Sequence, residues 1–235
     1  ATPGHNWITL VKNKDSEIKR LNDIYRNMLE KQDVKILDGR ARIVDEHTVS
    51  VNDKTYTADK ILIAVGGTPT LPDHSGVEHA ITSNEVFYLK DFPKNILIVG
   101  GGYIALEFAS IFQNLGSNVT LFYRRDLFLR GFDTDVRMAL RDEMIKQGVN
   151  IIFNSPAITD IDKIDDRLKV TLDNGESLET DQVLYAIGRR PLTEDLGLEN
   201  ANIKTDEIGA IKVNEGYQTS VANIYAVGDV TNRIN

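Results

Sequence analysis

One short glycine motif constrains this chain more than any other feature. Gly100-x-Gly102-x-x-Ala105 follows an apolar stretch, Ile96–Val99, and opens a stretch of helical periodicity, Tyr103–Leu115. In such a position the first glycine permits a tight turn, the second lets a phosphate approach the backbone, and the alanine lets the helix pack closely on the sheet. Free N–H groups at the helix N-terminus then favour an anion. The motif therefore predicts a dinucleotide-binding β-α-β unit.

Strands and helices alternate after the motif. We interpret Val119–Tyr123 and Val149–Phe153 as buried strands, and Thr134–Gln147 as a helix that ends at Gly148. This order is typical of the α/β class, with a doubly wound, Rossmann-like parallel sheet. Asp173-Asn174-Gly175 is a hairpin signal, so we expect an antiparallel β-meander over that sheet. The remaining expected strands are Ala157–Ile161, Leu168–Leu172, Gly175–Glu179 and the apolar Asp181–Ile187.

The segments on either side of this unit have a different pattern. Trp7–Glu30 carries apolar residues at helical spacing, whereas Pro69 and Pro72 exclude a regular helix or a central strand around them. We therefore expect the chain to pass from one domain to another near Pro69, and to cross back near Pro191. Short strands are expected at Val34–Leu37, Thr48–Val51, Lys60–Val65 and Ile224–Val227.

Composition excludes several functional classes. A net charge of −8 disfavours a nucleic-acid-binding face, and no apolar run approaches the roughly 20 residues needed to cross a bilayer. The chain contains no cysteine, which excludes disulfide bonds and thiolate zinc sites within it. We expect no metal site, no nucleic-acid partner and no membrane association.

The end of the second strand indicates which dinucleotide would bind. A site for NAD places an acidic residue there, which accepts a hydrogen bond from the ribose 2′-hydroxyl. This chain instead has Tyr123-Arg124-Arg125, and Arg130 follows shortly afterwards. Arginine binds a 2′-phosphate bidentately, and two charged hydrogen bonds of about 1.5 kcal/mol each correspond to roughly 150-fold preference for NADPH. The alternative is that Arg124 and Arg130 are solvated surface residues.

Three further phrases each end an apolar strand in glycine. They are Ile61–Gly67, Leu184–Gly188 and Ile224–Asp229. Glycine at such a point lets the backbone approach a ligand or another chain segment. Asp229 could accept hydrogen bonds from a sugar hydroxyl, and the alternative is an ordinary turn or cap aspartate.

Together these motifs resemble the successive signatures of the pyridine nucleotide–disulfide oxidoreductases, and within that family the glutathione reductases. The resemblance implies a flavoprotein oxidoreductase that passes electrons from NADPH through FAD and a protein disulfide to glutathione disulfide. It also implies a cytoplasmic homodimer with a role in redox homeostasis. The matching segments cover nearly the whole chain in order: Ile63–Pro69, Gly100–Ala109, Tyr123–Asp133, Ala186–Pro191 and Ile224–Val230.

The resemblance implies roles for particular residues. Those implied to contact NADPH are Gly100, Gly101, Gly102, Ile104, Ala105, Glu107, Arg124, Arg130 and Gly188. Those implied to lie by the flavin are Tyr103, which would move aside when NADPH docks, with Glu107 and Arg189. Those implied to contact FAD are Ala41, Gly66 and Asp229, the last on the ribityl chain. Ile24 and Tyr25 would line the disulfide-substrate cleft. The histidines match no functional position, and we interpret them as surface residues: His5, His47, His74 and His79.

Several parts of the family pattern are absent from this chain. The glycine motif for FAD, the redox-active cysteine pair and the dimerisation domain with the catalytic histidine have no counterpart here. We therefore expect a central fragment: 1–67 from the FAD-binding domain, 68–190 as the NADPH-binding domain, and 191–235 as an incomplete return to the FAD-binding domain. Such a fragment has no catalytic residues of its own. It should bind NADPH, retain little FAD, remain monomeric and not turn over.

Other interpretations stay open. Trypanothione reductase is the nearest, because Met28 fits that group, although Phe112–Thr120 lacks the short insertion usual there. Dihydrolipoamide dehydrogenase is disfavoured because the acidic strand end is missing, whereas mercuric reductase shares the motifs. A different class is a stand-alone nucleotide-binding or redox-sensing module without catalysis.

Overall fold

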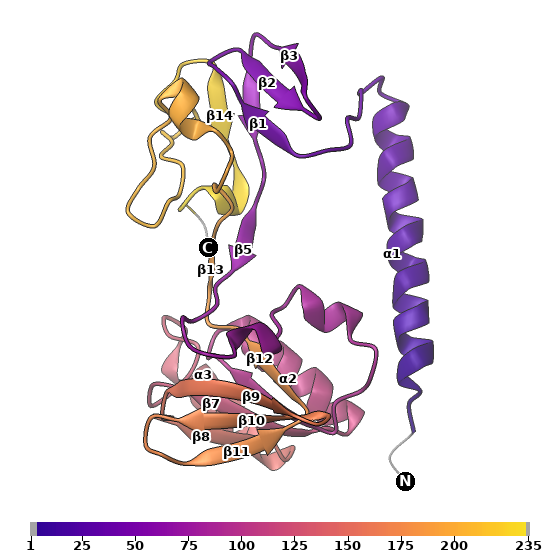
Figure 1. Ribbon diagram of the computed structural model, residues 1–235, viewed down its shortest axis with the longest axis vertical. Helices are drawn as coiled ribbons and strands as arrows, with labels where there is room; N and C mark the ends of the chain where they lie inside the picture. Colours follow the sequence, from indigo (N-terminus) through magenta and orange to yellow (C-terminus); the bar gives the residue numbers. More distant parts are fainter. Residues whose placement is uncertain (1–3, 234–235) are drawn as a thin grey trace. The chain divides into compact units, whose positions relative to one another are not determined.

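The computed structural model describes residues 4–233, and these form two compact units. The first unit contains the described residues up to Glu17 together with Pro69–Gly188, and the second contains Ile18–Thr68 and the chain from Arg189 onward. The long helix α1, Trp7–Glu30, is shared, because its first turns group with the first unit and the rest with the second. Two short strands, β5 (Gly67–Pro69) and β13 (Arg189–Pro191), pair where the chain passes from one unit to the other (Figure 1).

The first unit is built on a four-stranded parallel sheet in the order β12-β6-β7-β8. The central strands β6 and β7 pair with Ile96 opposite Val119 and Ile98 opposite Leu121. Side chains of a strand alternate between the two faces of its sheet. Ile96 and Ile98 accordingly join the hydrophobic core on one face, and Leu97 joins the core on the other. The strands are β6 (Asn95–Val99), β7 (Asn118–Tyr123), β8 (Asn150–Phe153) and β12 (Gln182–Tyr185).

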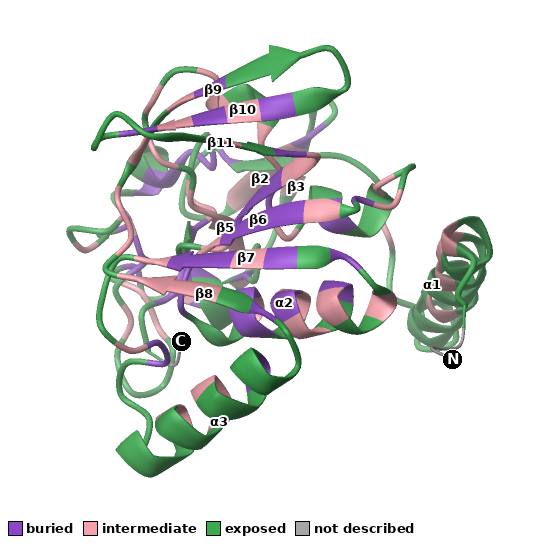
Figure 2. Ribbon diagram, turned by 90° about the horizontal axis from the view of Figure 1, so that it is seen from below, coloured by how far each residue is buried: buried purple, intermediate pink, exposed green. Residues whose placement is uncertain are grey.

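Helices cover one face of this sheet and an antiparallel meander covers the other (Figure 2). Helix α2, Tyr103–Leu115, buries Ala105, Ala109 and Phe112, which are spaced so that they share one helix face. Helix α3, Thr134–Lys146, is mostly exposed and has Met144 as its buried residue. The meander has the order β11-β10-β9 and packs Val170 and Ile161 against Leu97 and Phe122 of the sheet. Its strands are β9 (Ile158–Ile164), β10 (Arg167–Leu172) and β11 (Ser177–Thr180).

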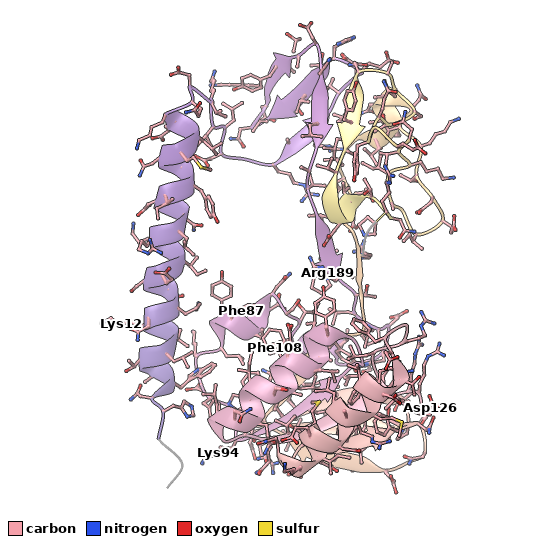
Figure 3. The ribbon with its side chains drawn as sticks, turned by 180° about the vertical axis from the view of Figure 1, so that it is seen from behind. Lys12, Phe87, Lys94, Phe108, Asp126 and Arg189 are labelled. Atoms are coloured by element: carbon pink, nitrogen blue, oxygen red, sulfur yellow. The ribbon has the colours of Figure 1, made fainter. Side chains whose placement is uncertain are left out.

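The segment between β5 and β6 closes one edge of the first unit. It contains two 3-10 helices, η1 (Val77–His79) and η2 (Glu85–Tyr88). The ring of Phe87 meets that of Phe108 on α2 edge-on, with 5.5 Å between centroids, and both are labelled in Figure 3. The indole N–H of Trp7 donates to the Leu89 carbonyl over 3.0 Å, so the start of α1 is held on the same segment.

The second unit has its own small core. The antiparallel strands β1 (Ala41–Ile43), β2 (Thr48–Val51) and β3 (Lys54–Thr57) form one sheet, and β4 (Ile61–Ile63) pairs in parallel with β14 (Ile224–Ala226). Buried residues of this unit, among them Ile43, Ile63 and Ile224, pack in one cluster. Two 3-10 helices complete the unit, η3 (Leu198–Ala201) and η4 (Gly228–Val230).

The α/β class, the Rossmann-like parallel sheet and the meander are confirmed, although the meander takes the place of helices on one face of the sheet. The prediction of a strand at Val34–Leu37 was wrong, because these residues follow the end of α1 without a strand assignment, and Val34 and Leu37 are 46% and 37% exposed. Strand β4 is also shorter than the expected Lys60–Val65, because β14 offers it partners only from Ile61 to Ile63. Strand β1 was not expected, and it is held by pairing with β2.

Candidate functional site

The turn between β6 and α2 has no room for side chains at its first two glycines. Gly100 has a φ of 149°, and a Cβ there would lie 2.2 Å from the carbonyl oxygen of Ala186 and 3.2 Å from the Cβ of Ala105. A Cβ on Gly101 would lie 2.3 Å from the ring of Tyr123. Distances this short are not tolerated between non-bonded carbon and oxygen atoms. Glycine is therefore required at both positions by contacts within the first unit.

Gly102 is different, because a Cβ there would meet nothing within 4 Å. The residue is the N-cap of α2, no side chain caps the helix, and its first turn contains no acidic residue. The N-terminal N–H groups of a helix need partners from outside the helix, and they attract anions. Open space in front of Gly102, with no carboxylate in the first turn to repel a phosphate, fits the close approach of a pyrophosphate.

The loop between β7 and α3 carries the two candidate arginines, and Asp126 in Figure 3 marks this loop. The side chains of Arg124 and Arg130 are exposed and make no hydrogen bond or ion pair with any of residues 4–233. The loop itself is anchored, since the N–H of Leu129 donates to the carbonyl of Gly101 over 2.7 Å. This bond joins the arginine loop directly to the glycine turn.

Every residue expected to contact NADPH falls in the first unit. Gly188 follows β12, the strand beside β6, and a Cβ on it would meet nothing within 4 Å. Tyr103 and Glu107 are exposed on α2, while Ile104 is half-buried and Ala105 is buried. The glycine turn, Gly188 and the arginine loop all follow the carboxyl ends of neighbouring parallel strands, where open α/β sheets bind ligands.

The residues expected near the flavin and the disulfide substrate lie elsewhere, apart from Tyr103 and Glu107. Ala41, Gly66, Arg189 and Asp229 belong to the second unit. The Arg189 guanidinium donates to the Gly67 carbonyl over 2.7 Å, and its Nε lies 3.5 Å from Oδ2 of Asp229. The structure thus pairs two residues that came from separate motifs. Three of the remaining positions are exposed, namely Ala41 on β1 and both Ile24 and Tyr25 on α1, whereas Gly66, with a φ of 76°, is half-buried.

Sequence reasoning missed two residues of this site. The ring of Tyr123 occupies the space against Gly101. Arg137, on the first turns of α3, donates hydrogen bonds to the backbone of the arginine loop. The first contact joins two different elements, and the second spans only nine residues from Arg137 to Phe128, but no local pattern indicates either of them. A helical arginine close after a cap aspartate, Asp133, is the one available hint, and it is a weak one.

One histidine interpretation needs correction. His74 is not an ordinary surface residue, because it is half-buried and its Nε2 lies 2.7 Å from the hydroxyl of Tyr185. Its Nδ1 lies 2.7 Å from the carbonyl oxygen of Ser75, so both ring nitrogens have partners. Burial raises the pKa of the Tyr185 hydroxyl well above its usual range, which keeps that group protonated. The pair therefore links the segment before η1 to β12.

Two kinds of site find no support in the part of the chain that the structure describes. Within residues 4–233, no three histidine, aspartate or glutamate side chains are grouped so that they could hold a metal ion. In the same residues no helix has both the length and the apolar content needed to cross a membrane.

Comparison with known proteins decides the family. A family model described as pyridine nucleotide-disulphide oxidoreductase matches residues 3–235. The chain belongs to this family. The family resemblance found in the motifs is thereby confirmed.

Individual proteins similar to this chain support the same assignment. A glutathione reductase of Nostoc sp. is 45% identical over 242 residues, which cover 98% of this chain and 52% of the relative. A trypanothione reductase of Leishmania donovani is 40% identical, over 97% of this chain and 49% of the relative. The solved structure of the HOCl-induced flavoprotein disulfide reductase RclA from Escherichia coli superposes with a TM-score of 0.91 at 31% identity, over 98% of this chain and 54% of that one. The chain spans about half the length of the relatives it matches.

Proposed function

We propose that this chain supplies the NADPH-binding part of a flavoprotein disulfide reductase whose substrate is glutathione disulfide. One observation carries the nucleotide assignment. Two exposed arginines without intramolecular partners stand on a loop that Leu129 ties to the glycine turn. A 2′-phosphate needs such donors, whereas the 2′-hydroxyl of NADH needs an acceptor at the strand end. The names of the relatives favour glutathione disulfide as the substrate of the parent enzyme.

The residues present fit the cofactor by shape and charge. Gly102 and Gly188 each leave open space that a side chain would fill, and the N-terminus of α2, which begins after Gly102, has no capping side chain. In the proposed mode, α2 binds the pyrophosphate while Arg124 and Arg130 bind the 2′-phosphate. When bound, NADPH supplies a hydride, and the protein contributes orientation and electrostatics. Tyr103, exposed on the first turn of α2, would cover the flavin until the nicotinamide docks.

We propose further that Ala41, Gly66 and Asp229 contribute to an FAD site, with Glu107 and Arg189 beside the flavin. The half-exposed carboxylate of Asp229 is able to accept hydrogen bonds from the hydroxyls of a sugar chain. The chain contains no cysteine, so it cannot form the redox disulfide from its own residues. On this proposal the chain alone binds NADPH, retains little FAD, remains monomeric and does not reduce glutathione disulfide. Location in the cytoplasm and a homodimeric parent are part of the same proposal.

The second candidate substrate is trypanothione disulfide. Met28 is exposed on α1, one turn beyond Ile24 and Tyr25, where an apolar side chain would suit a larger, less acidic disulfide. Against this candidate, α2 ends at Leu115 and β7 begins at Asn118, which leaves no inserted residues between them. The two disulfides differ in net charge, so a longer form of the protein with its cysteine pair would discriminate them by its ratio of kcat/KM values.

Calorimetric titration of the full chain with NADPH and with NADH, at one fixed salt concentration, tests the nucleotide assignment. We expect NADPH to bind roughly 100-fold or more tightly than NADH, because two charged hydrogen bonds to the phosphate contribute about 3 kcal/mol. Equal affinities would refute the assignment of the arginines. A flavin absorbance of one FAD per purified chain would refute the expectation of weak FAD binding.

A further inference from the structure

The arginine loop has a backbone conformation that it would not keep unaided. Leu129 has a φ of 52° and Gly131 a φ of 94°, so both neighbours of Arg130 lie in the left-handed region. That region is unfavourable for a bulky residue such as leucine. The conformation persists only when surrounding contacts determine it. The contacts that hold this loop therefore decide where the guanidinium of Arg130 stands.

Arg137 makes two of these contacts. Its Nε donates to the carbonyl oxygen of Phe128 over 2.7 Å, and its Nη2 donates to the carbonyl oxygen of Leu127 over 2.7 Å. Both bonds are partly buried, and no carboxylate among residues 4–233 forms an ion pair with Arg137. The planar fork of a guanidinium can span two successive carbonyls, which the single ammonium of lysine cannot do with the same geometry.

The start of α3 fixes Arg137 in turn. The Asp133 carboxylate accepts hydrogen bonds from the N–H groups of Asp135 and Val136, at 3.0 and 3.3 Å, so the first turn of the helix is capped. On the other side of the loop, the ring of Phe128 is fully buried, and Leu129 donates to Gly101. A continuous set of contacts thus runs from α3 through the loop to the glycine turn.

We propose that Arg137 is a positioning residue for the 2′-phosphate of NADPH. It acts through the loop backbone, by holding Arg130 and Arg124 in the orientation that the phosphate requires before the nucleotide arrives. The inference rests on the proposed function, because it assumes that these two arginines bind the phosphate. Without Arg137 the loop would have to become ordered when the nucleotide binds, and this ordering costs free energy. That cost would weaken the binding of NADPH, which uses the loop, and not that of NADH.

Affinities for NADPH and NADH, measured by calorimetry at one fixed salt concentration, test the proposal in four forms of the full chain. These are the unchanged chain, Arg137→Ala, Arg137→Lys and Arg141→Ala. Arg141→Ala is the matched control, because Arg141 lies one turn further along α3 and pairs with Asp142. Its replacement removes the same charge without affecting a contact to the loop. Lysine at position 137 keeps the charge and removes the fork.

We expect Arg137→Ala to weaken NADPH binding about tenfold and NADH binding less than about twofold, because ordering side chains and a loop on binding costs affinity only for the ligand that uses them. Arg137→Lys should recover at most part of the loss, and Arg141→Ala should resemble the unchanged chain. An equal loss for both nucleotides in Arg137→Ala would mean a merely structural role, and full recovery in Arg137→Lys would mean that charge alone matters. Either result overturns the proposal.

The two levels of the argument fail separately. If the unchanged chain shows no preference for NADPH, the proposed function is wrong, whatever the variants do. If the unchanged chain prefers NADPH and Arg137→Ala keeps that preference, the arginines bind the phosphate but Arg137 does not position them. Should Arg137→Ala fail to fold, as judged by the absence of a cooperative thermal unfolding transition, Arg137→Lys carries the test, and its undiminished preference for NADPH would overturn the proposal.

Discussion

Replacing both candidate arginines by alanine should remove the preference for NADPH while leaving the fold intact. The side chains of Arg124 and Arg130 are exposed and have no partners among residues 4–233, so their loss removes no contact within the protein. Charged hydrogen bonds from exposed donors contribute about 1.5 kcal/mol each, so the pair contributes about 3 kcal/mol. That free energy corresponds to roughly 150-fold in the dissociation constant.

Calorimetric titration of Arg124→Ala/Arg130→Ala measures this directly. The double variant should bind NADPH roughly 150-fold more weakly than the unchanged chain and NADH about equally well. Each single variant should bind NADPH about tenfold more weakly. The double variant Arg141→Ala/Lys146→Ala is the control for net charge, because it removes two cations of α3 that pair with Asp142 and Glu143. A double variant at positions 124 and 130 that still prefers NADPH by more than about tenfold would refute the reasoning.

Three further predictions follow from the glycine turn, the hydrogen bonds between Thr82 and Glu85, and the assembly state. Gly102→Ala should fold normally but lose NADPH affinity, because its Cβ would occupy open space where the phosphate is proposed to approach. Gly101→Ala should instead lower the melting temperature, because its Cβ would meet the ring of Tyr123. Thermal unfolding and NADPH titration of both variants distinguish the two effects. Hydrogen bonds from the Thr82 side chain and backbone lower the pKa of Glu85 below its ordinary value of 4.5, so its contribution to stability is present above that value and is lost as the pH falls through the lower folded-state pKa. Glu85→Gln should therefore lose stability at pH 7 and show a smaller loss on acidification, and denaturant titrations at two pH values measure both. Light scattering should give the mass of a monomer, and a stable dimer would contradict the proposal that this chain alone is monomeric.

Local patterns predicted the part of the molecule that carries the proposed nucleotide site. Helix α2 occupies Tyr103–Leu115 as expected, because the glycine turn, the apolar face with Ala105 and Ala109, and the glycine after the helix are all set within one short segment. Strands β6, β7 and β12 of the parallel sheet were equally visible, because burial on both faces makes each a short apolar run. The two arginines could be chosen from their position after such a strand.

Contacts between separate structural elements could not be predicted in this way. The packing of Tyr123 on Gly101 depends on how β7 lies against the glycine turn, and the bonds from Arg137 depend on how α3 lies against the arginine loop. His74 was misjudged because its partner, Tyr185, is far away in sequence. Val34–Leu37 has strand-forming residues, but no neighbouring strand pairs with it. In each case contacts in the tertiary structure decided the conformation, and the local sequence did not indicate them.

Hydrogen exchange of backbone amides, with and without NADPH, would test the central claim most directly, because it locates the nucleotide on the chain. The account predicts slower exchange on binding at Gly101–Leu106 and across the loop from Arg124 to Gly131, with no change in the sheet of β1, β2 and β3. Protection confined to other segments, or none at any NADPH concentration that saturates the calorimetric signal, would contradict it.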